Sequence, residues 1–129
     1  MQVRVRYCEC DPMGVAHHAS YLPWLEMART ELVRDQGVSY ASMEREGTFL
    51  VVADLSVRYR RPARYDDVLE IVTEVSRLTR ARVEHTYEVR LAERDGVVAD
   101  RVLLATATTT LACVDPTGKP RLMPDVLFT

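Results

Sequence analysis

The second half of the chain consists almost entirely of long strand-like segments, and this limits the folds open to it. These segments run from Phe49 to Arg61, Val68 to Leu78, Arg82 to Glu93 and Val97 to Val114. Apolar and polar residues alternate along the last of them, as in a strand with one buried face. Asp95-Gly96 is a strong signal for a two-residue hairpin turn. The short turns predict one antiparallel sheet.

The first half of the chain predicts one more strand and one long helix. Residues 2–9 alternate as a half-buried strand does, and the turn residues of 11–14 follow. Ser20 is placed to cap a helix that Gly37 ends, and residues 39–46 predict a short second helix. The result is an α+β arrangement, with about five antiparallel strands around one long helix.

Composition narrows the class of protein. The 129 residues suit a single domain spanning 1–129, and 17 basic against 19 acidic residues argue against a nucleic-acid or membrane footprint. No segment approaches the ~20 apolar residues that cross a bilayer, and the amino terminus does not resemble a signal peptide. The odd count of 3 cysteines suits a reducing compartment, so we expect a cytoplasmic protein.

The cysteines also bear on metal binding and on nucleophilic chemistry. Cys8 and Cys10 lie two residues apart in the predicted first strand, with Cys113 far away in the sequence. Their spacing matches no familiar zinc site. A strand is also a poor place to stabilise a thiolate. We therefore expect buried small residues here and no metal site.

A segment near the amino terminus carries the functional signal. It begins at Tyr7, continues through Asp11-Pro12-Met13-Gly14 and His17-His18-Ala19-Ser20, and opens the helix that contains Glu26-Met27-Ala28-Arg29. Together with the block from Pro62 to Glu70, it resembles the 4-hydroxybenzoyl-CoA thioesterase family, and within that family the YbgC-like acyl-CoA thioesterases. The resemblance spans about Val3 to Val114. It implies a hotdog fold, an acyl-CoA thioester hydrolase, and a homodimer or homotetramer with active sites between protomers. Self-association would also cover the sheet edges.

The resemblance assigns roles to individual residues. It implies that Asp11 is the catalytic carboxylate, that His18 and Tyr7 assist it, and that Gly14 and Val15 contact the substrate. The chemistry agrees, because a thioester carbonyl must be polarised and then attacked by a carboxylate or by water that a carboxylate activates. The amino terminus of the nearby helix can hold the oxyanion. No cofactor is expected, since coenzyme A is part of the substrate.

Arginines form two clusters in the sequence. Arg80 and Arg82 bracket the turn between two predicted strands, and the resemblance implies that they bind the phosphates of coenzyme A. The other cluster, from Arg58 to Arg64, is interpreted as the solvated faces of strands. His17 is interpreted as pocket lining or surface rather than as a second base.

Two other functions stay open at this point. A hotdog dehydratase acting on hydroxyacyl thioesters would use a catalytic His with an acidic residue inside the helix, without Asp11 ahead of the turn. A non-enzymatic protein would bind an acyl thioester or a partner without turnover, and would not need a carboxylate beside the carbonyl. The acyl group is not specified, and acyl carrier protein stays open as an alternative carrier and partner.

Overall fold

The computed structural model describes residues 1–128 and contains one five-stranded sheet. The strands are β1 (Gln2–Arg4), β2 (Phe49–Tyr59), β3 (Val68–Leu78), β4 (Arg82–Arg94) and β5 (Val97–Val114). They lie in the order β1-β3-β4-β5-β2, and every neighbouring pair is antiparallel. This confirms the sheet predicted from the alternating segments. The short β1 and the long β2 form its two edges.

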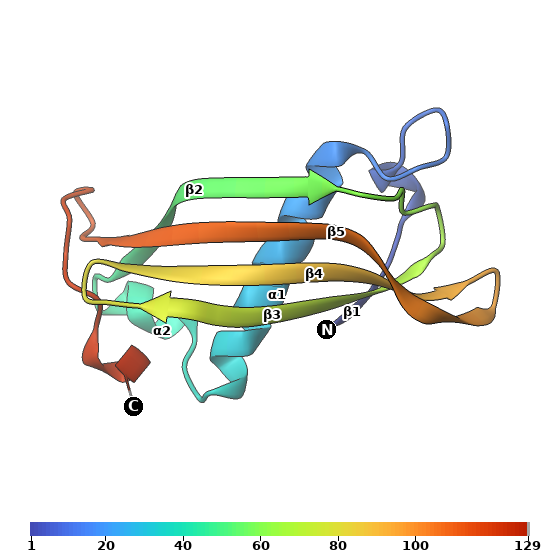
Figure 1. Cartoon of the computed structure of the whole chain (residues 1–129). Coiled ribbons are helices and arrows are strands. Elements are labelled where there is room, and N and C mark those ends of the chain that lie inside the picture. The colour runs from blue at the N-terminus through green and yellow to red at the C-terminus, as the bar shows by residue number, and fades with distance from the viewer. Residues whose placement is uncertain (129) are drawn as a thin grey trace.

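Helix α1 (Tyr21–Asp35) crosses one face of this sheet, as Figure 1 shows. Its buried residues recur at spacings of three and four, which places them on a single side of the helix. They are Tyr21, Trp24, Leu25, Ala28, Arg29 and Val33. Gly37 follows with a φ of +82°, and its N–H bonds the carbonyl of Arg34 at 2.9 Å, so the helix ends where the sequence predicts. The short second helix, α2 (Tyr40–Arg45), is also confirmed.

A β-bulge interrupts edge strand β2. The register with β5 shifts between Val52 and Asp54, which reverses the alternation of faces along the strand. Leu50, before the shift, and Val57, after it, therefore both pack into the core. Most of the strand between them is exposed.

The first strand is shorter than predicted, and this changes the interpretation of the cysteines. The carbonyl of Val5 bonds the N–H of Asp66, and residues Tyr7–Glu9 then coil into a turn of 3-10 helix. Strand pairing cannot continue through that turn. Cys8 is exposed and Cys10 is half-buried, so the prediction that both are buried in a strand was wrong.

The core consists of two apolar clusters with polar side chains between them. The larger cluster surrounds Trp24 and Leu25 of α1, and the smaller one includes Leu111 and Met123. Buried polar groups, among them Arg29, His85 and Thr109, lie on the strands and helix that join the two clusters. No helix within residues 1–128 is long and apolar enough to cross a membrane.

Candidate active site

The loop from residue 10 to residue 16 is a tight turn built around Asp11. The N–H of Asp11 bonds the carbonyl of Val15, and the N–H of Gly14 bonds the carbonyl of Asp11, both at 2.9 Å. The carboxylate oxygen Oδ1 accepts the N–H of Met13 at 2.9 Å and that of Val15 at 3.4 Å. Gly14 has a φ of +78°, which suits glycine far better than other residues. The second carboxylate oxygen, Oδ2, accepts no hydrogen bond from residues 1–128.

Glu9 fixes this loop to the start of α1. Its buried carboxylate accepts the N–H of Arg6 at 2.7 Å and the indole N–H of Trp24 at 2.9 Å. Its carbonyl accepts the N–H of His17 and the hydroxyl of Ser20, both at 2.8 Å. Ser20 therefore ties the loop to the helix start. It does not cap α1 as predicted, because its backbone is already helical (φ −68°, ψ −22°) and its side chain accepts no N–H of the first turn. Glu9 lies between Tyr7 and Asp11 in the motif, and no role was predicted for it from the sequence.

An open cleft of about 390 Å³ brings Asp11 and His18 together. Tyr21 and Tyr59 meet edge to face along it, with ring centroids 5.0 Å apart. Burial raises the pKa of both phenols, which favours their neutral, hydrogen-bonding forms. The remaining lining residues are Ala16, Arg60, Arg61 and Pro62.

The two neighbouring histidines have different roles. The Nδ1 atom of His17 accepts the N–H of Ala19 at 3.1 Å, so His17 caps the 3-10 turn His18–Ser20 that leads into α1. His18 lines the cleft, and its carbonyl accepts the hydroxyl of Tyr59 at 2.9 Å. The N–H of His18 has no acceptor among residues 1–128, whereas the N–H groups of Ala19 and Ser20 are both bonded. Of the three N–H groups in the turn that leads into α1, only that of His18 is therefore available as an oxyanion donor.

Three predicted site residues of this segment, Tyr7, Gly14 and Val15, are not among the residues that line the cleft, and the role of Gly14 in substrate binding stays a prediction. Tyr7 is 80% exposed, and its ring meets that of Tyr65 edge to face at 5.6 Å. Val15 supports Asp11 through its backbone, and it pairs with Arg64 in an isolated β-bridge. Neither side chain lines the cleft. Their assigned roles in catalysis and substrate binding stay predictions.

The predicted phosphate ligands lie at the other end of the sheet from the Asp11 loop (Figure 1). Arg80 already has protein partners: it donates to the carbonyl of Met123 at 2.9 Å, pairs with Asp125 at 2.8 Å and lies 4.0 Å from the centre of the Phe128 ring. Arg82 lies 4.0 Å from Glu84. In one protomer these arginines are not part of the Asp11 cleft.

The arginines that do line the cleft come from the cluster interpreted as solvated strand faces. Arg60 and Arg61 lie on the cleft wall just after β2, and neither forms an ion pair within residues 1–128. The backbone joins them to β5, since both N–H groups bond the carbonyl of Leu104. No local sequence motif distinguishes Arg60 and Arg61, because their position beside Asp11 arises only when β2 pairs with β5.

Neither a thiol nor a metal centre accompanies the carboxylate. Burial raises the pKa of the Cys10 thiol, with Glu9 and Asp11 adding to the effect, which disfavours a nucleophilic thiolate. Within residues 1–128 there is no group of three or more His, Cys, Asp or Glu side chains arranged to hold a metal ion. The candidates for chemistry in this cleft are therefore Asp11 and the polar groups around it.

Comparison with known proteins identifies relatives of this chain. Residues 5–128 match the model of the thioesterase-like superfamily. The acyl-CoA thioester hydrolase YbgC of Escherichia coli is 38% identical over 123 residues, which cover 95% of this chain and 87% of the relative.

Solved structures of thioesterases share the fold. The DHNA-CoA thioesterase of Staphylococcus aureus is 32% identical with a TM-score of 0.86, covering 95% of this chain and 78% of that one. A probable thioesterase from Bartonella henselae is 32% identical with a TM-score of 0.83, covering 96% and 97%. The predicted hotdog fold, one main helix against a curved antiparallel sheet, is thus confirmed.

Proposed function

The chain belongs to the thioesterase-like superfamily, and we propose that it hydrolyses acyl-CoA thioesters with Asp11 as the reacting carboxylate. The observation that carries this proposal is the difference in environment between the two carboxylate oxygens of Asp11. One oxygen accepts two backbone N–H groups, whereas the other accepts no hydrogen bond from residues 1–128 and lies in a cleft that also contains His18. A carboxylate that served only the turn would have no need of a cleft beside it.

In the proposed reaction, the thioester carbonyl oxygen accepts a hydrogen bond from the backbone N–H of His18. This bond stabilises the oxyanion as it forms. Asp11 Oδ2 either removes a proton from the attacking water or attacks the carbonyl carbon itself. The carbon–sulfur bond then breaks, and the thiolate of coenzyme A takes up a proton. In the second route, water hydrolyses the resulting acyl-aspartyl anhydride. Both routes consume one water and need no cofactor.

We further propose that two copies pair along β2. This edge strand has 11 residues and exposes Val51, Val52 and Tyr59, which are 42%, 48% and 47% accessible. A long, partly apolar edge invites pairing with another chain. A two-fold axis would join β2 to its own copy in antiparallel fashion. A larger homo-oligomer, such as a tetramer, would need a further contact surface.

Such pairing would also change the position of the predicted phosphate-binding residues, Arg80 and Arg82, relative to the Asp11 cleft. The Phe49 end of β2 lies on the same side of the sheet as the β3–β4 turn, whereas the Tyr59 end lies at the Asp11 loop (Figure 1). Antiparallel pairing would therefore bring Arg80 and Arg82 of the partner towards the Asp11 cleft. There they would join Arg60 and Arg61 around the phosphates, and the same basic surface would suit the phosphopantetheine of an acyl carrier protein.

The cytoplasm is the proposed compartment. Cys8, Cys10 and Cys113 are all free thiols, and Cys8 is exposed. Free exposed thiols suit a reducing environment.

The direct test of the activity is single-turnover hydrolysis of acyl-CoA esters by wild type and by Asp11→Asn. Asparagine preserves the acceptor in the turn but removes the charge and the basicity, so the rate should fall by about 100-fold or more. Asp115→Asn is a matched control, because the Asp115 carboxylate accepts the N–H groups of Thr117 and Lys119 in a similar turn outside the cleft. Its rate should stay at the wild-type level.

A wild-type rate from folded Asp11→Asn would contradict the proposed mechanism.

The general-base route and the nucleophilic route are distinguished by a single turnover of the wild-type protein in ¹⁸O-labelled water. If Asp11 acts as a general base, the labelled water oxygen enters the acid product directly. Attack by Asp11, followed by hydrolysis at its own carbonyl, leaves the label in the protein.

A further inference from the structure

A second cavity contains a buried positive charge without a counter-ion. Arg29 is 8% exposed and, within residues 1–128, forms no ion pair. The other two buried charges are satisfied, since Glu9 accepts the indole N–H of Trp24 and Asp67 pairs with Arg94 at 2.8 Å. A buried charge without an opposite charge beside it is strongly destabilising, which distinguishes Arg29 from Glu9 and Asp67.

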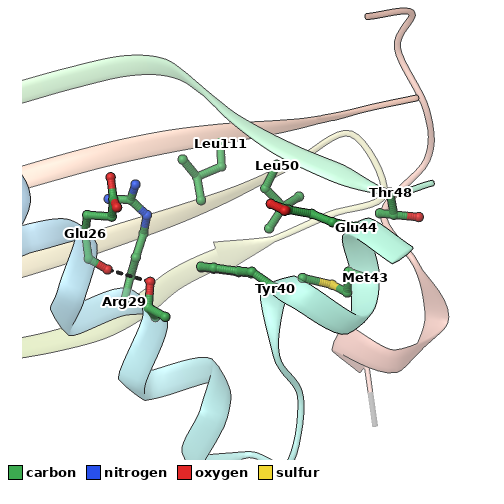
Figure 2. A pocket seen from close by; sticks show the side chains of 9 residues that line it. Glu26, Arg29, Tyr40, Met43, Glu44, Thr48, Leu50 and Leu111 are labelled. Carbon is green, nitrogen blue, oxygen red and sulfur yellow. Dashed lines mark hydrogen bonds between the residues drawn. The ribbon is translucent and has the colours of Figure 1, made fainter. Parts of the chain in front are cut away.

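The cavity holding Arg29 has a volume of about 240 Å³ and lies between α1, α2 and the start of β2 (Figure 2). Its polar lining comprises Glu26, Arg29, Thr30, Tyr40, Glu44 and Thr48. A small apolar pit of about 30 Å³ adjoins it, with Tyr40 and Leu50 lining both spaces.

Two more buried polar groups face these spaces without a partner. The hydroxyl of Tyr40 and both ring nitrogens of His85 form no hydrogen bond within residues 1–128. His85 is 2% exposed and lines the pit. Buried polar groups are almost always hydrogen-bonded in native proteins. The Tyr40 hydroxyl, one N–H of the His85 ring and the Arg29 guanidinium can each donate, so one acceptor placed among them would serve all three, while the second ring nitrogen of His85 would still lack a donor. The guanidinium also acts on the phenol of Tyr40: burial raises the pKa of Tyr40 to about 12, and the nearby charge of Arg29 opposes this rise.

The position of the cavity connects it to the Asp11 cleft of a second copy. Leu50, near the start of β2, lines the Arg29 cavity, and Tyr59, at its end, lines the Asp11 cleft. In the antiparallel β2 pairing proposed above, the start of one strand lies beside the end of the other. The Asp11 cleft of each protomer would then adjoin the Arg29 cavity of its partner.

We infer that the Arg29 cavity of one protomer receives the acyl group of the thioester bound at the Asp11 cleft of the other, and selects acyl groups that end in a carboxylate. The inference rests on the proposed hydrolysis and dimer. A carboxylate offers a bidentate partner to the guanidinium and an acceptor to the hydroxyl of Tyr40. The apolar pit would accommodate part of the carbon chain.

The carboxylates of Glu26 and Glu44 at the cavity rim oppose an incoming anion. Both residues are exposed, so water and salt screen their charges, whereas the buried charge of Arg29 is screened far less. The balance therefore favours the anion once its carboxylate reaches Arg29. Removing one rim charge should favour it further.

The first test compares adipoyl-CoA with hexanoyl-CoA, which match in chain length and differ in the terminal carboxylate. Wild type should favour adipoyl-CoA. Arg29→Met should lower kcat/KM for adipoyl-CoA by about 10-fold or more, the value of a charge-assisted hydrogen bond, and leave hexanoyl-CoA little changed. Tyr40→Phe should also lower kcat/KM for adipoyl-CoA, but by less. This second variant keeps the inference testable if Arg29→Met fails to fold. Arg34→Met is the matched control, because Arg34 is an exposed arginine on the same helix that pairs with Glu31.

The second test asks whether the two halves of the site come from different protomers. Asp11→Asn and Arg29→Met protein are unfolded together, refolded as an equal mixture and assayed with adipoyl-CoA. In a shared site, half of the dimers are mixed and each has one intact site, so activity should reach about a quarter of wild type. In a site within one chain, no intact site can form, and activity no greater than the average of the two unmixed variants would overturn the inference.

A structural role for Glu26 is the competing outcome. If Glu26 turns inward as the counter-ion of Arg29, then Glu26→Gln should destabilise the protein as much as Arg29→Met does. Adipoyl-CoA would then have no advantage over hexanoyl-CoA in wild type. That pair of results would refute the inference while hexanoyl-CoA hydrolysis, and its loss in Asp11→Asn, still supports the proposed function.

Discussion

Acid should destabilise this protein through one buried histidine. Burial, and secondarily the positive charge of Arg29, lowers the pKa of His85 from 6.5 to about 4. The unfolded chain takes up this proton below about pH 6.5, whereas the folded chain resists it until about pH 4. Stability due to the neutral imidazole is therefore complete above the unfolded pKa and is lost as the pH falls from about 6.5 to 4.

The size of the effect follows from the shift in pKa. A pKa difference of about 2.5 units corresponds to roughly 3 kcal/mol when fully expressed, and to about 2 kcal/mol by pH 5. Most of the ordinary carboxylates stay ionised at pH 5, so the histidine dominates this part of the profile. Few single side chains contribute as much to the pH dependence of a small domain.

The measurement is urea unfolding at pH 7 and pH 5 for wild type and His85→Leu, at one fixed protomer concentration. Leucine fills a similar buried space but binds no proton. The free energy of unfolding of wild type should fall by about 2 kcal/mol more than that of the variant over this interval. Equal losses in the two proteins would mean that the folded chain protonates His85 normally, and would refute the reasoning.

Two further predictions follow from the proposed function. Light scattering at micromolar concentration should give at least twice the 14.7 kDa mass of one chain, and a single-chain mass would rule out the β2 dimer. Arg80→Ala should raise KM for acyl-CoA but not for a short thioester that lacks the nucleotide, because only the former has phosphates for the guanidinium. A lowered melting temperature with both KM values unchanged would mean that Arg80 serves only the carboxyl-terminal contacts with Met123 and Asp125.

The sequence predicted the fold well in those segments whose structure depends on the local alternation of residues. The long β3, β4 and β5 strands combine alternation with short turns, and each lies within a residue of its predicted bounds. The predicted end of the first strand was wrong, because residues 2–9 alternate equally well throughout and the pattern does not show where pairing stops. What ends β1 after Arg4 is a tertiary contact, the pairing of Val5 with the turn at Asp66 and Asp67. That contact leaves no mark on the local periodicity.

The candidate site was predictable to the extent that it is local in sequence. Asp11 and His18 belong to one continuous motif and do line one cleft. Tyr59 and Arg60 could not be placed there from the sequence, since they reach the cleft only through sheet pairing. The partners of Arg80 lie more than forty residues away, at Met123 and Asp125, so no local motif indicates that this guanidinium already has protein partners.

In the proposed mechanism one oxygen of Asp11 holds the turn and the other reacts, and this determines which substitution should be used to test the residue. Oδ1 holds the turn through the N–H groups of Met13 and Val15, while Oδ2 accepts no hydrogen bond from the described part of the chain. Alanine would remove both functions at once, and a loss of activity would then say little about chemistry. Asparagine retains an acceptor for the turn. Glu9 separately fixes the ends of the loop through Trp24 and Ser20. A folded Asp11→Asn protein therefore isolates the negative charge as the variable, and its rate reports on catalysis rather than on the shape of the loop.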